Sequence, residues 1–351
     1  CPLPASSRSH PYFVNGHRLT ESAVIVGTTT WGTTLSVILA HRGIPVTLLA
    51  RTAAESKLLE SARKNSRFLP ETTFPEALKV TADVQRACAS AAVVILAVPS
   101  DRLRQNVKDV RDYLEDDAIV VSATKGLELP SASRMSQVLE DELPPSFHSG
   151  ICALSGPNLA KEIIQGKPAS TVVAGNPAAT ERAQTLLMSN LFRVYTSTDL
   201  LGVELAGTLK NIVALGAGIS DGLEVGDNAK AAFVTRGLAE ITRLGVAAGA
   251  EPLTFAGLAG LGDVIATCSS QFSRNRYVGE QLARGRSWSD IRESMDNVAE
   301  GVNATEAALK LAKELDVEMP IAETMYRVLY EGLSPREAAA ELMERPPRSE
   351  W

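Results

Sequence analysis

The stretch Val24 to Thr33, VIVGTTTWGT, decides the fold of the chain. A short β-branched run ends at Gly27, and a helix is expected to open near Gly32. In a loop of the GxGxxG type, the first glycine permits a tight turn, the second admits a pyrophosphate to the backbone, and the third lets helix and strand pack closely. Thr29 stands at the second place, where its branched side chain is expected to crowd the phosphate. The amides and dipole of the following helix remain, so the loop is expected to hold an anion less well.

The residues around this loop predict an α/β fold. A strand over Ala23 to Val26, a helix over Thr33 to His41 and a strand over Val46 to Leu49 make one βαβ unit. The runs Ala92 to Val98 and Ala118 to Ser122 lack polar alternation, as do strands covered on both faces. We therefore expect a doubly wound parallel sheet of the Rossmann-like type.

The second half of the chain predicts a different architecture. After about Asn190 the strand signals fade, and Ala, Leu, Gly and Glu follow helical spacing to the end. The polar YTSTD segment offers helix caps before a long helix that begins near Leu200. The expected division is a disordered leader over 1–21, a dinucleotide-binding domain over 22–197 and an all-helical substrate and catalytic domain over 198–351. A transit peptide is the alternative for the leader.

Composition excludes several classes of partner. The 35 Lys and Arg against 41 Asp and Glu give a net charge of -6 with no basic run, which argues against nucleic acid. No CxxC pair occurs, so neither a metal site nor a disulfide framework is expected, and a reducing cytoplasmic setting fits best. The weakly polar stretch from Leu200 to Leu223 is interrupted by Glu204 and Lys210, so we expect no membrane span. A small molecule is the expected partner, with a homodimer left open.

The second strand ends at Leu49-Ala50-Arg51 without a carboxylate. An arginine at this place can pair with a 2'-phosphate, so NADP is permitted beside NAD. The alternative is that Arg51 is a solvated loop cation.

A lysine in the helical half is the candidate general acid and base. All four histidines lie outside that half, whereas Lys210 stands in the apolar run ELAGTLKN. Desolvation would lower its pKa toward neutrality, and the small Gly207 would leave room for substrate. The alternative is that Lys210 snorkels or pairs with a carboxylate.

Two downstream segments add polar groups. Asp263 and Thr267 are four residues apart on one expected helical face, and the SRNR run from Ser273 to Arg276 gathers donors suited to a phosphate monoester. Each segment alone is also compatible with a helix cap or a surface turn.

Several motifs in order resemble the bacterial-type NAD(P)-dependent glycerol-3-phosphate dehydrogenases. The resemblance runs from about Ala23 and rests on AVPS (97–100), TKGLE (124–128), LSGPNLAKEI (154–163), ELAGTLKNI (204–212), GDNAKAA (226–232) and GLAGLGD (257–263). It implies an oxidoreductase that transfers hydride reversibly between NAD(P)H and dihydroxyacetone phosphate, giving sn-glycerol 3-phosphate for glycerophospholipid synthesis. The alternatives are a related two-domain hydroxy-acid dehydrogenase and a ligand-binding homologue whose cofactor site Thr29 impairs.

The resemblance also implies roles for individual residues. Lys210 would exchange the proton, Asp263 would orient it, and Lys125 would touch both ligands. The substrate contacts implied, together with the neighbouring polar candidates, are Lys125, Gly156, Asn158, Lys210, Asn211, Asp263, Thr267, Ser273, Arg274 and Asn275. The cofactor contacts implied are Thr30, Trp31, Arg51, Lys125, Ala160, Arg274, Val298 and Glu300. The loop positions Gly27, Thr29 and Gly32, together with Pro99, complete the candidate cofactor residues. The chain departs from the family at Thr29, usually glycine, at Thr30, usually serine, and at Asn158, commonly serine or threonine.

Overall fold

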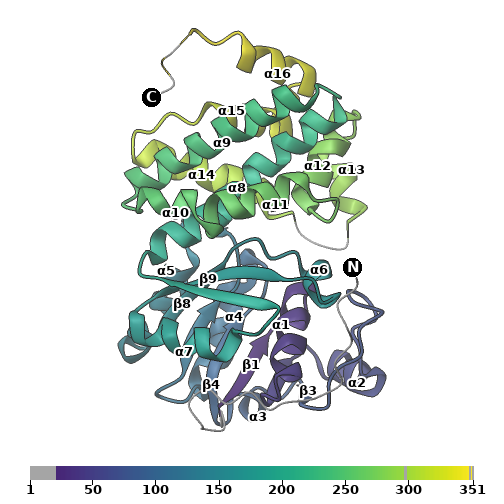
Figure 1. The fold of residues 1–351 in the computed structure, drawn as a ribbon, viewed down its shortest axis with the longest axis vertical. Coiled ribbons are helices and arrows are strands. Elements are labelled where there is room, and N and C mark those ends of the chain that lie inside the picture. Colours follow the sequence, from purple (N-terminus) through teal and green to yellow (C-terminus); the bar gives the residue numbers. More distant parts are fainter. Residues whose placement is uncertain (1–20, 296–298, 348, 350–351) are drawn as a thin grey trace.

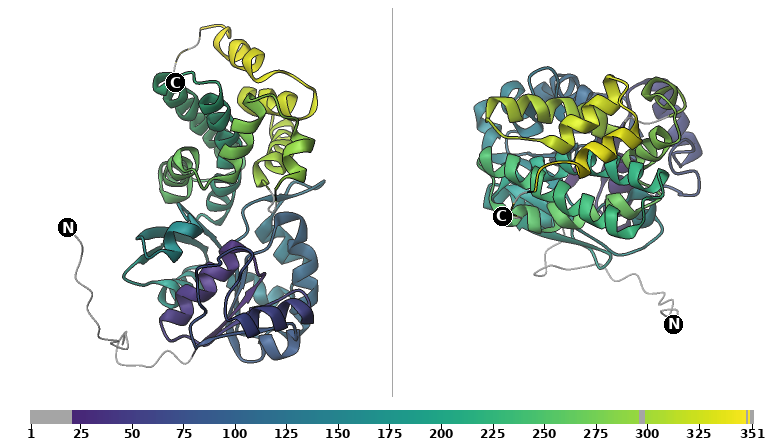
Figure 2. Two further views of the ribbon diagram at one scale, coloured as in Figure 1. Left: turned by 90° about the vertical axis from the view of Figure 1, so that its right-hand side faces the viewer. Right: turned by 90° about the horizontal axis from the view of Figure 1, so that it is seen from above.

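The protein is described from a computed structural model that covers residues 21–295, 299–347 and 349. A sheet half over residues 21–197 and a helical half over residues 200–347 stack along the long axis of the molecule (Figure 1), and Figure 2 shows the same arrangement from the side. The expected leader lies outside the described residues except for Glu21, whose carboxylate accepts a hydrogen bond from Arg182 Nε at 2.8 Å.

The sheet half is built on eight strands in the order β10-β9-β8-β5-β4-β1-β2-β3. Neighbouring strands are parallel except β8 and β9, which are antiparallel, so the predicted parallel sheet has one reversed pair. The strands are β1 (Ser22–Val26), β2 (Val46–Leu49), β3 (Leu78–Thr81), β4 (Ala91–Leu96), β5 (Ile119–Ser122), β8 (Ile151–Ser155), β9 (Ala169–Gly175) and β10 (Phe192–Ser197); β6 (Leu127–Glu128) and β7 (Ser133–Arg134) form a separate hairpin.

The expectation that strand signals end near Asn190 is wrong, because a further strand of the sheet, β10, follows over Phe192–Ser197. Phe192 and Val194 are buried, whereas Arg193 and Tyr195 are exposed. This alternation is typical of a strand at a sheet edge with one face covered. The change to helices then falls between Ser197 and Leu200, where Asp199 caps α8 by accepting from Gly202 N at 2.8 Å.

Helices cover both faces of the sheet. One apolar core joins the strands to α1 (Thr30–His41), α2 (Ala53–Ala62), α6 (Ala160–Ile164) and α7 (Pro177–Leu187). The opposite core joins them to α3 (Val84–Cys88), α4 (Leu103–Val110) and α5 (Met135–Glu142). The central strands β4 and β5 are buried almost throughout, which explains their continuous apolar sequences.

The helical half surrounds α8 (Leu200–Gly222). The other helices are α9 (Asp227–Ala247), α10 (Pro252–Ala256), α11 (Asp263–Ser269), α12 (Arg274–Ala283), α13 (Trp288–Glu293), α14 (Glu300–Glu314), α15 (Pro320–Tyr330) and α16 (Pro335–Met343), with a π-helical turn over Leu258–Gly262. Helix α12 crosses α8 with almost no gap, because a Cβ at Gly218 would lie 1.9 Å from Arg276 O and one at Gly279 would lie 1.9 Å from Leu215 O. Glycine is therefore required on both sides of this crossing.

Within the described residues, two segments are long and apolar enough, by length and composition alone, to cross a membrane, so the interruption by Glu204 and Lys210 does not by itself exclude Leu200–Gly222. In Leu200–Gly222, 89% of the apolar window is buried inside the protein, as in the interior helix of a folded domain. In Pro252–Ser269 the value is 39%, and this segment is divided among α10, the π-helical turn and α11.

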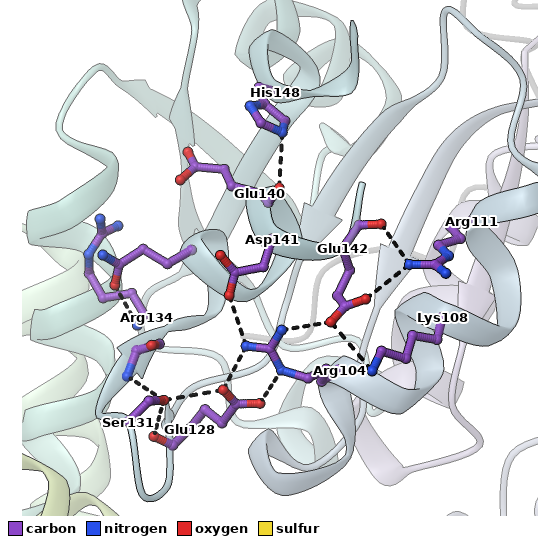
Figure 3. A network of polar contacts seen from close by, with 12 residues as sticks. Arg104, Lys108, Arg111, Glu128, Ser131, Arg134, Glu140, Asp141, Glu142 and His148 are labelled. Carbon is purple, nitrogen blue, oxygen red and sulfur yellow. Dashed lines mark hydrogen bonds and ion pairs between the residues drawn. The ribbon is translucent and has the colours of Figure 1, made fainter. Parts of the chain in front are cut away.

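A charged network holds the hairpin β6–β7 against α4 and α5 (Figure 3). Arg104 on α4 donates to both carboxylate oxygens of Glu128 at 2.7 and 2.8 Å, to Glu142 at 2.7 Å and to Asp141 at 3.0 Å. Hydrogen bonding to Arg104 lowers the pKa of Glu128. Since Glu128 follows Lys125 in the same segment, the network fixes the backbone that presents Lys125 to the helical half.

Candidate active site

A buried triad of side chains lies where α8 meets α11. Lys210 Nζ donates to Asp263 Oδ1 at 2.9 Å and to Thr267 Oγ1 at 2.5 Å, and Thr267 donates to Asp263 Oδ1 at 3.0 Å. Asp263 is the first residue of α11 and directly follows the π-helical turn, whose carbonyls accept from its backbone amide. The expected placement of Asp263 and Thr267 on one helical face is confirmed by their hydrogen bond.

Lys125 reaches the same carboxylate from the sheet half. Its Nζ donates to Asp263 Oδ2 at 2.5 Å and to Gly156 O at 2.9 Å. One carboxylate therefore holds two ammonium groups, and these contacts join the two halves of the chain.

The environment adjusts the protonation of this cluster. Burial lowers the pKa of Lys210 to about 8, with the nearby Lys125 also lowering it and Asp263 raising it. Burial alone would raise the pKa of Asp263, but the two lysines hold it below its ordinary value. The arrangement thus provides a permanent carboxylate beside an amine that can gain or lose a proton near neutral pH.

The loop after β8 approaches the triad with two unsatisfied oxygens. Gly156 has φ 144°, which favours glycine, and Asn158 Nδ2 donates to Thr171 Oγ1 at 2.8 Å. Ser155 Oγ and Asn158 Oδ1 are buried without a hydrogen-bond partner among the described residues. Such atoms mark a place where a bound hydroxyl or water completes the hydrogen bonding.

Gly207 does not have the role expected of it. A Cβ at this position would lie 2.3 Å from Ser155 Oγ. The space that glycine leaves is therefore filled by the Ser155 side chain at the end of β8 rather than kept for substrate.

The SRNR run is the start of helix α12 rather than a turn. Ser273 is its N-cap and accepts from Arg276 N at 3.2 Å, while Arg276 Nε donates to Asp221 Oδ2 at 2.5 Å. The Arg274 side chain is exposed, although neighbouring protein atoms displace part of the water around its guanidinium. This desolvation lowers the pKa of Arg274, whereas the charge of Glu300 raises it. A guanidinium in such a position suits an anionic ligand.

Two asparagines tie three helices together beside Lys210. Asn275 Nδ2 donates to Asn211 Oδ1 at 2.8 Å, and Asn275 Oδ1 accepts from Gly301 N at 2.9 Å. Asn211 and Asn275 are both buried. These bonds fix the positions of α8, α12 and α14 relative to one another, next to the candidate site.

The cofactor loop is shaped by its two glycines. Gly27 has φ 109°, and a Cβ there would lie 2.8 Å from Ala97 O; a Cβ at Gly32 would lie 2.1 Å from Gly27 O. The first amides of α1, at Thr30 and Trp31, have no intrahelical acceptor and face this loop. The loop is therefore a cradle of free amides at a helix start, which could hold an anionic group.

Thr29 is part of this cradle and is not strained. Its backbone is extended, with φ -65° and ψ 169°. Its hydroxyl donates to Ala97 O at 2.8 Å and accepts from Gly32 N at 3.0 Å. The Thr29 hydroxyl is thus turned toward Gly32 and Ala97, where it caps α1 and ties the loop to the residue after β4.

The remaining cofactor candidates come from both halves. Trp31 packs against Phe192 with ring centroids 6.3 Å apart, Pro99 precedes a short helical turn, and Ala160 begins α6. Glu300 Oε2 accepts from Ser100 Oγ at 2.7 Å, which places α14 against the loop after β4. Val298 lies outside the described residues.

Sequence interpretation missed Glu55, which supplies a carboxylate near the end of β2. Its Oε2 accepts from Arg51 N at 3.1 Å and its Oε1 from Thr28 Oγ1 at 2.6 Å. Thr52 caps α2 and accepts from Glu55 N at 3.1 Å. The T-x-x-E spacing of a capping box could have directed attention to it.

Comparisons with known proteins agree with this geometry. The model of the NAD-dependent glycerol-3-phosphate dehydrogenase N-terminus matches residues 22–181, and that of the C-terminus matches residues 199–340. The chain is 54% identical over 321 residues to glycerol-3-phosphate dehydrogenase [NAD(P)+] of Dehalococcoides mccartyi, covering 91% of this chain and 89% of that one. It is 45% identical to the enzyme of the same name from Chlorobium limicola, with 93% and 98% covered.

A solved structure gives the same result. The crystal structure of glycerol-3-phosphate dehydrogenase from Coxiella burnetii superposes with a TM-score of 0.87 at 34% identity, covering 93% of this chain and 99% of that one. The chain belongs to the family of NAD-dependent glycerol-3-phosphate dehydrogenases.

Proposed function

We propose that Lys210 exchanges the proton when this NAD(P)-dependent glycerol-3-phosphate dehydrogenase interconverts dihydroxyacetone phosphate and sn-glycerol 3-phosphate. The observation that carries the proposal is the buried triad, in which Lys210 is desolvated yet held by Asp263 and Thr267 at 2.9 and 2.5 Å. An amine with a pKa of about 8 can donate a proton in one direction and accept it in the other.

The nicotinamide cofactor supplies the hydride when it is bound. In the direction of reduction, the Lys210 ammonium hydrogen-bonds to the substrate carbonyl oxygen, polarises the carbonyl bond and gives its proton to the alkoxide oxygen as it forms. Asp263 stays ionised and orients both lysines, so that Lys125 adds a second positive charge near that oxygen. In the direction of oxidation, neutral Lys210 takes the hydroxyl proton.

The start of α12 is the proposed phosphate site. Arg274 offers a charge-assisted contact, Ser273 offers its hydroxyl, and Asn275 lies beside them on the first turn of the helix. Asn158, with its unpartnered Oδ1, is proposed to accept from a substrate hydroxyl. At the other end of the site, Gly27, Thr30, Trp31, Gly32 and Arg51 are proposed to hold the dinucleotide, with Pro99, Ala160 and Glu300 lining it.

The proposed partner is a small phosphate ester, and the proposed setting is the cytoplasm. We also propose a homodimer, which is supported by large apolar side chains exposed in the segment from α10 to α11: Leu253, Leu261 and Ile265. Sedimentation velocity of the purified chain tests the assembly, and a monomer across micromolar concentrations would contradict it.

The function is tested by following oxidation of NADH and of NADPH with and without dihydroxyacetone phosphate. We expect substrate-dependent oxidation, product formation of sn-glycerol 3-phosphate, and competitive inhibition by that product. The control substrate is a 2-oxo acid, because a hydroxy-acid dehydrogenase would reduce it. Such an enzyme would not need the phosphate-binding donors of α12. Oxidation only with the 2-oxo acid, or binding of glycerol 3-phosphate without turnover, would overturn the proposal.

A further inference from the structure

The adenosine end of the cofactor site carries a fixed carboxylate. In dinucleotide-binding folds, the ribose 2'-position is recognised where the second strand ends. Here β1 and β2 are paired so that Val26 lies opposite Leu49, and Gly27 N donates to Leu49 O at 3.3 Å. The loop after β1 and the loop after β2 therefore lie side by side, and the adenosine ribose must enter between them.

Glu55 bridges these two loops from the first turn of α2. One carboxylate oxygen accepts from the Thr28 hydroxyl at 2.6 Å and the other from the Arg51 amide at 3.1 Å. The loop is held from its other side by Asn65, whose Nδ2 donates to Thr28 O and to Thr33 Oγ1 at 2.9 Å each. The carboxylate is thus part of a braced structure rather than a mobile surface charge.

Arg51 and Glu55 present opposite charges at this place. The Arg51 side chain is exposed and can pair with a 2'-phosphate. Glu55 is partly buried, and its carboxylate accepts from the Arg51 backbone amide, so that amide is not free to bind a phosphate. A phosphate monoester carries about -1.5 to -2 charges at pH 7, so it is repelled by a carboxylate held this close. A ribose 2'-hydroxyl, by contrast, can donate a hydrogen bond to the same carboxylate.

We infer that Glu55 is a specificity-determining residue that disfavours NADPH relative to NADH, acting against Arg51. This inference rests on the proposed use of the β1 and β2 loops as the cofactor site. It assigns the discrimination to a side chain on α2 rather than to the end of the strand itself.

The test compares the wild type with Glu55→Gln, which keeps the size and an acceptor oxygen but removes the charge. Adenosine 2',5'-bisphosphate carries the 2'-phosphate and 5'-AMP lacks it, so calorimetric titration with both reports on this subsite without requiring turnover. We expect Glu55→Gln to bind the bisphosphate at least about fivefold more tightly, with 5'-AMP unchanged or weakened. The ratio of kcat/KM for NADH over NADPH should fall by a similar factor.

Salt and a matched variant separate charge from structure. The repulsion of the bisphosphate by Glu55 should weaken between 50 and 500 mM salt, because salt screens a partly exposed charge. The difference in bisphosphate affinity between the wild type and Glu55→Gln should therefore become smaller as salt is added. Glu181→Gln, an exposed carboxylate on α7 at the other end of the sheet, should leave the ratio unchanged.

Two results would overturn the inference. Glu55 would be only a structural brace if Glu55→Gln changed the affinities for both nucleotides equally, or if it weakened the bisphosphate. The proposed function fails separately, since it requires oxidation of reduced cofactor that depends on dihydroxyacetone phosphate, whatever the ratio of the two nucleotides.

Discussion

The cofactor loop and the lysine triad are built on opposite principles. In the loop, the groups proposed to meet the ligand are backbone amides. The backbone there needs residues without a side chain at Gly27 and Gly32 and a capping side chain at Thr29. In the triad, three side chains bond to one another inside the protein, and each is defined by its functional group. A loop of the first kind tolerates a departure that keeps the backbone, whereas a cluster of the second kind tolerates almost none.

The largest effect is expected at Lys210. Lys210→Met removes the exchangeable proton, and Lys210→Arg keeps a charge that does not titrate, so both should lower kcat by about 100-fold or more while NADH binding persists. Steady-state kinetics and fluorescence titration of NADH measure the two quantities. Lys313→Met, an exposed lysine on α14, is the matched control. Retention of a tenth of wild-type kcat in either variant would make Lys210 a structural residue.

The next effect concerns the loop and contrasts with the first. Gly32→Ala places a Cβ 2.1 Å from Gly27 O, so the loop must move. We expect the KM for NADH to rise about tenfold or more, with a smaller change in kcat at saturation. Gly150→Ala is the control, since its Cβ would be in ordinary contact at 3.4 Å. If Gly32→Ala lowered kcat alone, the loop would not be the cofactor cradle.

The triad could be predicted from sequence only in part. Lys210 stood out because a lysine interrupts an apolar run, and the Asp263 and Thr267 pair followed from helical spacing. Spacing alone could not show that Lys125, distant in sequence, shares the Asp263 carboxylate, because that contact depends on how the sheet half meets the helical half. The family resemblance supplied Lys125 only as a residue that touches both ligands, and its ion pair with Asp263 was not predicted.

The loop shows a different limit of sequence reasoning. The βαβ pattern placed β1 and β2 to within one residue but started α1 at Thr33 instead of Thr30, and it could not reveal which way the Thr29 side chain turns. The bond from the Thr29 hydroxyl to Ala97 O depends on β4, which lies next to β1 in the sheet but far along the chain, whereas the capping bond from Gly32 N is local. Glu55 was missed for the same reason, because its carboxylate reaches backward to Thr28 across a loop.

A medium-sized effect should appear in the pH dependence. Lys210 is protonated below its pKa of about 8, so kcat/KM for dihydroxyacetone phosphate should be level below that pH and fall up to tenfold per unit above it. Oxidation of glycerol 3-phosphate should show the opposite slope. Asp263 raises the pKa of Lys210, so Asp263→Asn should move both profiles to lower pH, besides reducing the rate.

Profiles recorded above pH 7 avoid the second ionisation of the substrate phosphate, which lies near 6. An unchanged midpoint in Asp263→Asn would show that the titrating group is not Lys210.

The smallest effect is expected at Thr29, where the two interpretations of the loop predict different values of the KM for NADH. Thr29→Val keeps the branched shape but removes the cap of α1 and the bond to Ala97 O. Losing these bonds should cost about 1 to 2 kcal/mol of unfolding free energy while changing the KM for NADH by less than about twofold. Thr29→Gly removes the side chain altogether, so it would lower that KM severalfold if the side chain crowded the phosphate. Because the hydroxyl is turned to Gly32 and Ala97, we expect no such gain, and denaturant unfolding together with the NADH titration of both variants decides between the two.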